Sequence, residues 1–222
     1  MSTKLPLSLV IFGKDNEDSL AICIASVYAL TSEIIYVDTG SRTGAAIDIA
    51  RNFGARVYGI GFSDFGNIRS LTAHLACQDW VLGLDTDEII APEDLGKIEG
   101  LIKVEDVDVY GLPRRRWSDL RRSQQVEVEA YPDWQYRLFR NKPDAIRWDN
   151  RVHERLVVKT GTRVMTATEG PHIEHFQDVF KKDQRLAERN RLYRRLYNAD
   201  IASGVIHTIP PVVDLDEEEK DD

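Results

Sequence analysis

The chain has 222 residues and a mass of 25.3 kDa, which fits one large domain, with or without appendages, and leaves little room for two independent domains. Hydrophobic residues make up 42% and charged residues 30%, so the chain is not globally disordered. The net charge of −8 argues against a nucleic-acid-binding protein. Cys23 and Cys77 show no metal-ligand spacing, so we expect both to be small residues of the core. The low cysteine content also predicts that the protein is located in the reducing cytoplasm.

The first hundred residues alternate the patterns of buried strands and helices. Strands are expected at residues 5–12, 34–37, 56–60 and 80–84. Helices are expected at residues 18–31, 45–53 and 67–77, and from Pro92 onward. This alternation predicts an α/β fold with a mostly parallel central sheet and helices on both faces.

Polar side chains follow several of these expected strands. Lys14 follows the first strand, Asp38 the second, and Asp85 and Asp87 the fourth. Ligands of such sheets bind beyond the carboxyl ends of the strands, so these residues are expected on one rim. Two carboxylates two positions apart suit Mg²⁺ or Mn²⁺ bridging a nucleotide diphosphate. A solvated acidic turn is the alternative interpretation of the Asp85-Thr86-Asp87 segment.

The second hundred residues have a different pattern and a different charge. Residues 1–100 carry 7 basic and 14 acidic side chains, whereas residues 101–200 carry 21 basic and 16 acidic ones. Alternating segments at 107–112, 126–130 and 134–139 predict antiparallel strands, with the arginines at 114–116 and 121–122 in a loop between them. A basic helix is expected over residues 176–197. Residues 201–222 form an acidic tail that we expect to be disordered.

The segment Asp38-Thr39-Gly40-Ser41 is also typical of aspartic proteases. Those enzymes need two such carboxylates that share a proton, and no second Asp-Thr-Gly occurs in this chain. The favoured interpretation is a carboxylate at a strand end that accepts hydrogen bonds from a nucleobase or a ribose. A helix cap by Ser41 or Thr43 is compatible with that role.

Three further sets of residues could carry chemistry. His153 and Glu154 could be a polar partner and a general base beside an acceptor hydroxyl, or solvated residues of a strand. Either His172 or His175 could complete a metal site. Arg69 follows Asp64-Phe65 at a helix start and could contact a phosphate at the rim. Most other arginines are expected to be solvated, although the basic helix could also bind a diphosphate, an anionic acceptor or a membrane surface.

Taken in order, these motifs resemble the family 2 glycosyltransferases of GT-A fold, particularly the small bacterial branch that includes lipopolysaccharide-core glucosyltransferases. The resemblance covers roughly residues 5–200. It rests on ordered motifs that begin at residues 14, 38, 64, 80, 136 and 152, followed by a histidine before the terminal helix. It implies a Rossmann-like sheet with an antiparallel C-terminal portion and a terminal helix. Residues 1–100 would bind the nucleotide-sugar, and residues 101–200 would form the acceptor side of the same domain.

The family resemblance also implies a reaction and a set of roles. A sugar would pass with inversion from a nucleotide diphosphate-sugar, expected to be a UDP-sugar, to a glycan, lipid-linked or protein acceptor. The implied donor-binding residues are Lys14, Asn16, Asp38, Arg69 and Asp85. The implied ligands of Mn²⁺ or Mg²⁺ are Asp85, Asp87 and His175. Glu154, with His153 beside it, is the expected base.

The chain departs from the family pattern at one loop. The family usually continues Asp-Thr-Gly-Ser as Thr-Asp-Gly-Thr, whereas this chain has Arg42-Thr43-Gly44-Ala45. A non-catalytic sugar-nucleotide-binding relative therefore stays an alternative. A nucleotidyltransferase is disfavoured because the segment after the first strand is acidic instead of basic and glycine-rich. We expect a cytoplasmic protein in a cell-envelope pathway, with the basic helix allowing contact with the inner face of a membrane.

Overall fold

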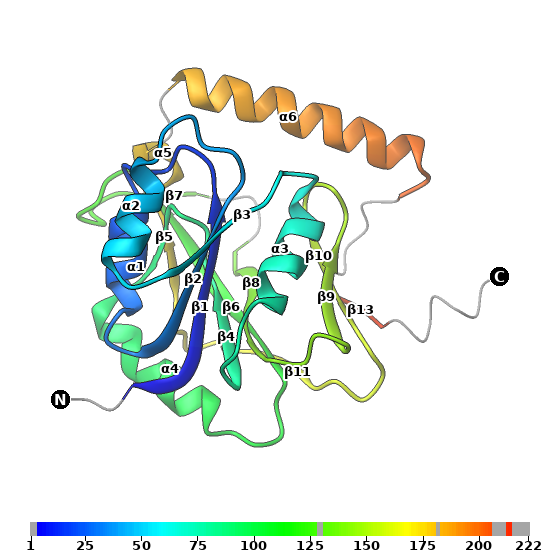
Figure 1. Ribbon diagram of the computed structural model, residues 1–222. Coiled ribbons are helices and arrows are strands. Elements are labelled where there is room, and N and C mark those ends of the chain that lie inside the picture. Colours follow the sequence, from blue (N-terminus) through cyan, green and yellow to red (C-terminus); the bar gives the residue numbers. More distant parts are fainter. Residues whose placement is uncertain (1–3, 128–130, 181–182, 206–211, 215–222) are drawn as a thin grey trace.

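The computed structural model describes residues 4–127, 131–180, 183–205 and 212–214 (Figure 1). Its strands are β1 (Leu5–Gly13), β2 (Thr31–Asp38), β3 (Arg56–Gly59), β4 (Trp80–Gly83), β5 (Glu88–Ile90), β6 (Val109–Trp117), β7 (Gln125–Val126), β8 (Asp133–Arg140), β9 (Ile146–Asp149), β10 (Arg155–Val158), β11 (Val164–Thr166), β12 (Ile173–His175) and β13 (Val212–Asp214). Its helices are α1 (Leu20–Val27), α2 (Ala45–Asn52), α3 (Phe65–His74), the 3₁₀ turn η1 (Pro92–Asp94), α4 (Leu95–Ile102), α5 (Gln177–Phe180) and α6 (Asp183–Ala202).

The central sheet has the strand order β3-β2-β1-β4-β8-β6-β12-β5, with β7 and β11 paired to β6. The first four strands are parallel, whereas β8 is antiparallel to both of its neighbours. A second, small sheet contains β9, β10 and β13. The predicted α/β fold, parallel first and antiparallel later, is confirmed.

Apolar residues from both faces of the sheet form the core. One cluster includes Leu9, Ile11 and Tyr36 and packs under α1, α2 and α4. The other includes Val10, Val37 and Trp148 and lies on the side of α3 and β9. Because neighbouring residues of a strand point to opposite faces, a continuous apolar strand such as β1 serves both clusters.

The arginines at 114–116 are not in a loop, as the sequence predicted, but inside β6. Carboxylates from neighbouring elements allow this: Arg114 pairs with Glu88 and Asp133, Arg115 with Glu174, and Arg116 with Asp178. The alternation of a strand sends Arg114 and Arg116 to the cleft described below, and Arg115 away from it. Carboxylates that are distant in the sequence therefore neutralise the three arginines and allow residues 114–116 to form part of a strand.

The C-terminal region differs from its prediction in two respects. Within the expected helix over 176–197 the structure has α5 and the longer α6, which extends to Ala202, and residues 181–182 between them lie outside the described residues. Within the expected disordered tail, Val212–Asp214 forms β13, parallel to β10, while residues 206–211 and 215–222 lie outside the described residues.

The two cysteines also differ from each other. Cys23 is buried as expected, but Cys77 is exposed, because it follows the end of α3 and lies beside the Arg56 guanidinium, 3.2 Å from Nη1. Across the described ranges, the structure contains no helix with both the length and the apolar character needed to span a bilayer.

Replacing Gly66 with alanine is expected to destabilise the protein by about 1–3 kcal/mol, because a Cβ there would lie 2.6 Å from the backbone oxygen of Asn150. This contact holds the first turn of α3 against the chain after β9, where the Gly66 N–H donates to the same oxygen at 3.2 Å. Gly100, in α4, is the matched control: a Cβ there meets open space, and alanine should stabilise the helix by about 0.5–1 kcal/mol. Urea denaturation of both variants tests the difference in sign, and equal effects would contradict it.

Candidate active site

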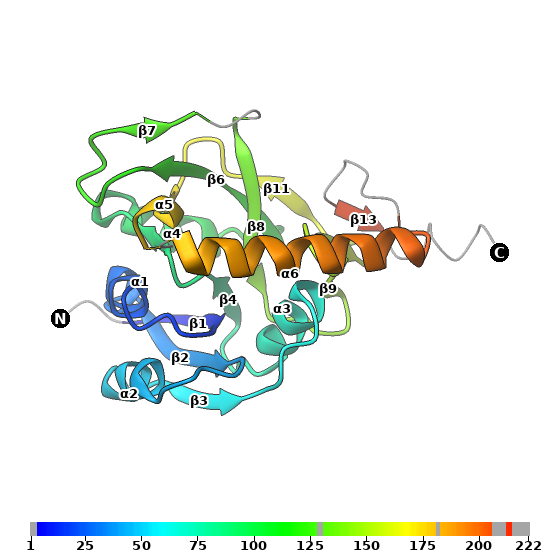
Figure 2. The ribbon, with the colours of Figure 1, turned by 90° about the horizontal axis from the view of Figure 1, so that it is seen from above.

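A cavity of about 1410 Å³ lies beyond the carboxyl ends of β1, β2 and β4. The α6 helix passes over this end of the sheet (Figures 1 and 2). The cavity is lined by the loops after β1, β2 and β4, by β6 and β8, and by α6. This is where a parallel sheet is expected to bind its ligand.

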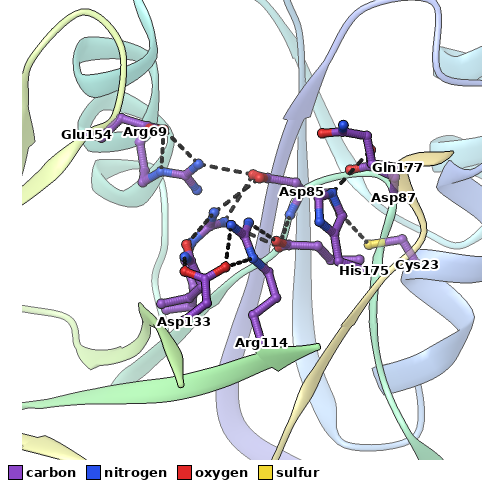
Figure 3. A network of polar contacts seen from close by, with 12 residues as sticks. Cys23, Arg69, Asp85, Asp87, Arg114, Asp133, Glu154, His175 and Gln177 are labelled. Carbon is purple, nitrogen blue, oxygen red and sulfur yellow. Dashed lines mark hydrogen bonds and ion pairs between the residues drawn. The ribbon is translucent and has the colours of Figure 1, made fainter. Parts of the chain in front are cut away.

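A buried ion network forms the floor of the cleft (Figure 3). The Asp85 carboxylate accepts hydrogen bonds from Arg69 Nη2 at 3.0 Å and from Arg137 Nη1 and Nη2 at 3.0 and 3.1 Å. Burial would raise the pKa of Asp85, but the positive charges of Arg137 and Arg69 hold it well below its usual value. Asp85, expected as a donor-binding residue and a metal ligand, is therefore an ionised group already engaged by two arginines.

Glu154 belongs to the same network. Its Oε1 accepts hydrogen bonds from Arg69 Nε at 3.1 Å and Nη2 at 2.8 Å. Burial opposes ionisation, but the charge of Arg69 outweighs it and lowers the pKa of Glu154. His153 lines the cleft beside it, with a left-handed φ of 55° and its ring edge-on to Tyr193 of α6, 6.0 Å between centroids.

Asp87 and His175 form a different kind of pair. His175 Nε2 lies 3.6 Å from Asp87 Oδ2, and both side chains are almost buried. The pairing of β12 with β5 brings them together, because His175 is opposite Glu88, the residue after Asp87. The other candidate histidine, His172, instead contacts Asp94 at 3.0 Å and does not line the cleft.

The oxygen and imidazole donors of Asp87 and His175 fit a hard divalent cation such as Mn²⁺ or Mg²⁺. Among the described residues, no group of three or more His, Cys, Asp or Glu side chains could hold a metal ion by itself. Divalent ions in nucleotide sites usually take only one or two carboxylates and complete their shell with phosphate oxygens and water. The pair therefore fits an ion that arrives with a diphosphate.

The loops after β1 and β2 hold the remaining predicted residues. Lys14 and Asn16 line the cleft, and Asn16 Oδ1 accepts the Lys14 N–H at 2.6 Å. Asp38 does not line it: its carboxylate accepts the N–H groups of Gly40 and Ser41 and the Ser41 hydroxyl. Arg69, by contrast, lines the cleft and packs its guanidinium over the Phe12 ring.

The sequence allowed the basic helix to bind a diphosphate, but it did not identify which residues of α6 face the cleft. Arg189 lines the cleft, donates to Gln177 Oε1 and lies over the Tyr193 ring. Its Nε is buried without a hydrogen-bond acceptor among the described residues. The rings of Phe65 and Tyr193 pack with their centroids 5.1 Å apart. Near the end of α6, Asp200 Oδ1 pairs with Arg151 Nη1 at 2.9 Å. The only signal was the basic and aromatic composition of this helix, which does not define the face that turns inward.

Comparison with known proteins gives relatives that are longer than this chain. This chain is 31% identical over 149 residues to a TPR repeat-containing protein of Synechococcus elongatus, and the match covers 67% of this chain and 34% of that protein. It is 32% identical over 104 residues to an uncharacterized glycosyltransferase of Rickettsia typhi, covering 47% of this chain and 35% of that one. The chain thus spans about a third of the length of these curated relatives.

Structural comparison supports the same fold. The structure of S. aureus TarS in complex with UDP superposes with a TM-score of 0.58 at 12% identity, covering 89% of this chain and 72% of that one. At this identity the likeness concerns the fold alone. The sequence model of glycosyl transferase family 2 matches residues 8–195, which include every strand from β1 to β12 except the first residues of β1. The chain therefore belongs to glycosyl transferase family 2.

Proposed function

We propose that this protein is an inverting, metal-dependent glycosyltransferase that uses a nucleotide diphosphate-sugar, specifically a UDP-sugar, as donor. The main support for this proposal is the Asp87–His175 pair, which lies in an arginine-lined cleft at the strand ends of a family 2 chain. Asp87 and His175 would hold Mn²⁺ or Mg²⁺. When bound, that ion would offset negative charge on the departing diphosphate.

Several residues of the protein would bind the nucleotide diphosphate that leaves. Arg189 is suited to the diphosphate, because within the described part of the chain its guanidinium donates to the neutral Gln177 and its buried Nε has no acceptor. Asp85 would fix Arg69 and Arg137, and Arg69 would contact the nucleotide together with Lys14 and Asn16. These donors are already oriented, so they would not need to reorganise as charge develops.

For the acceptor side, we propose Glu154 as the group that takes the proton of the attacking hydroxyl. It is an ionised carboxylate that lines the cleft, as a general base must be. Its ion pair with Arg69 weakens its basicity, which limits its contribution to about 10²-fold, the lower end for such groups. His153 would help to hold α6 over the cleft through its contact with Tyr193.

The acceptor would be a hydroxyl of a glycan, a lipid-linked glycan or a protein. Arg191 and Arg194 of α6 are exposed and do not line the cleft. They support peripheral contact with the anionic inner face of a membrane, which suits a lipid-linked acceptor in a cell-envelope pathway.

Donor hydrolysis by the purified chain tests this function. UDP-, GDP- and CMP-sugars are incubated with and without Mn²⁺, and both nucleotide release and binding are measured. We expect slow, Mn²⁺-dependent hydrolysis of a UDP-sugar. Binding without turnover, even with added acceptors, would favour a non-catalytic sugar-nucleotide-binding protein, and binding of no donor would refute the proposed site.

A further inference from the structure

Arg42 and Asp15 form an ion pair at the edge of the cleft, from two loops that follow β1 and β2. Asp15 Oδ2 accepts a hydrogen bond from Arg42 Nε at 2.9 Å, and Oδ1 accepts the Arg42 backbone N–H at 2.7 Å. Both residues line the cleft. Burial would raise the pKa of Asp15, but the hydrogen bonds and charge of Arg42 lower it. The pair is therefore ionised at neutral pH.

A relay of hydrogen bonds holds this pair in place. The Asp38 carboxylate accepts a hydrogen bond from the Ser41 hydroxyl, and Ser41 Oγ accepts one from the Asp15 backbone N–H at 2.9 Å. Asp15 has a left-handed φ of 53°, a conformation that costs energy for a residue other than glycine. Asp38, which does not reach the cleft, is thus connected to it through Ser41, Asp15 and Arg42.

One end of the Arg42 guanidinium is available for a ligand. Its Nε is used by Asp15, whereas its two Nη groups have no hydrogen-bond acceptor within the described part of the chain. The side chain is 64% exposed. The terminal Nη groups carry donors only, so a facing carbonyl oxygen would satisfy them and a facing amino group would not.

The position and charge of the pair indicate what it faces. Asp87 follows β4, and β2 lies two strands from β4 in the sheet, about 10 Å at the usual spacing. If the diphosphate binds near β4, the nucleoside extends toward β2. A phosphate would suit Arg42 poorly because Asp15 already neutralises it, whereas a neutral, polar base edge would suit it well.

We propose that Arg42, held by Asp15, donates a hydrogen bond to the carbonyl oxygen at ring position 4 of the donor's uracil and so selects uracil over cytosine. These bases differ at ring position 4, where uracil has a carbonyl oxygen and cytosine an amino group. The inference rests on the proposed function, since it assigns the base specificity of the same donor site. Arg42 stands at the loop where the sequence departs from the usual family pattern, so the selectivity would be a property of this chain.

The test compares the binding of UDP and CDP to the full chain by titration calorimetry in the presence of Mn²⁺. Wild-type protein is expected to bind UDP about tenfold more tightly than CDP, the size of one hydrogen bond to a charged group. Arg42→Ser should lose about tenfold for UDP and little for CDP, so that the preference disappears. Arg51→Ser is the matched control, because Arg51 is equally exposed, on α2, and does not line the cleft.

Asp15→Asn provides a second variant that keeps the side-chain shape and weakens the hold on Arg42. It should reduce the UDP preference without abolishing UDP binding. An equal loss for UDP and CDP in Arg42→Ser, or an unchanged preference, would overturn the inference while leaving the donor site intact. If wild-type protein binds neither nucleotide, the proposed UDP-sugar donor and this inference both fall.

Discussion

Replacing Asp87 with asparagine is expected to lower donor turnover by about 10³-fold with little change in stability. Asp87 is almost buried beside His175, and asparagine keeps its shape while removing the negative charge that would hold a cation. Loss of one preorganised electrostatic group in a closed site typically has an effect of this size. The expected loss concerns the departure of the diphosphate, so nucleoside binding without metal should persist.

Two measurements separate this role from a purely structural one. Mn²⁺ binding in the presence of UDP, followed by electron paramagnetic resonance, should be strongly weakened in Asp87→Asn, and hydrolysis should fall with it. Asp48→Asn is the control, because Asp48 is a well-exposed aspartate on α2, outside the cleft. Normal Mn²⁺ binding by the Asp87 variant would remove Asp87 from the metal site.

Replacing Arg137 with methionine is expected to destabilise the protein by about 3–5 kcal/mol, or about 10 °C in melting temperature. The Arg137 side chain is 7% exposed and serves two carboxylates, Asp85 at 3.0 Å and the fully buried Glu88 at 3.5 Å. Methionine would fill much of the volume of the Arg137 side chain, but it would remove one positive charge from beside the Asp85 and Glu88 carboxylates. Chemical denaturation measures the loss.

The effect should depend on pH. Arg69 and Arg137 help to lower the pKa of Glu154 below the value of about 4.3 that it has in an unfolded chain. A lowered carboxylate pKa adds stability that is present above about pH 4.3 and is lost as the pH falls through the folded-state value. The stabilities of wild type and Arg137→Met should therefore converge on acidification. Arg51→Met, which affects an exposed arginine, should change stability by less than about 0.5 kcal/mol; an equally small effect at Arg137 would show that the network contributes nothing.

The sequence predicts the structure best where the signal is local. The apolar strands and the helical spacings of the first hundred residues predicted the parallel half of the sheet. Strand ends then placed Asp85 and Asp87 on the rim that the cleft now occupies. At β6 the prediction of a loop from three consecutive arginines is wrong, because their carboxylate partners lie on other strands and helices.

Residues whose contacts depend on distant segments were harder to assign. Arg137 belonged to a recognised motif, but only the antiparallel pairing of β4 with β8 brings it to Asp85. Arg189 belonged to a basic helix, but only the packing of Tyr193 and Asp200 turns it into the cleft. Asp38 lies at the end of its strand, as the last residue of β2, yet its side chain turns into the loop that follows.

The sequence by itself determined the order of the parallel strands and the helices between them, the acidic rim at the strand ends and the family, because these depend on local periodicity and short motifs. The tertiary structure decided how the charges are shared: Asp85 and Glu154 are engaged by arginines, whereas Asp87 faces a histidine. Such sharing depends on contacts between distant residues, as for Arg69 and Glu154, which are 85 positions apart. Periodicity within one strand or helix carries no information about the charges that fold against it.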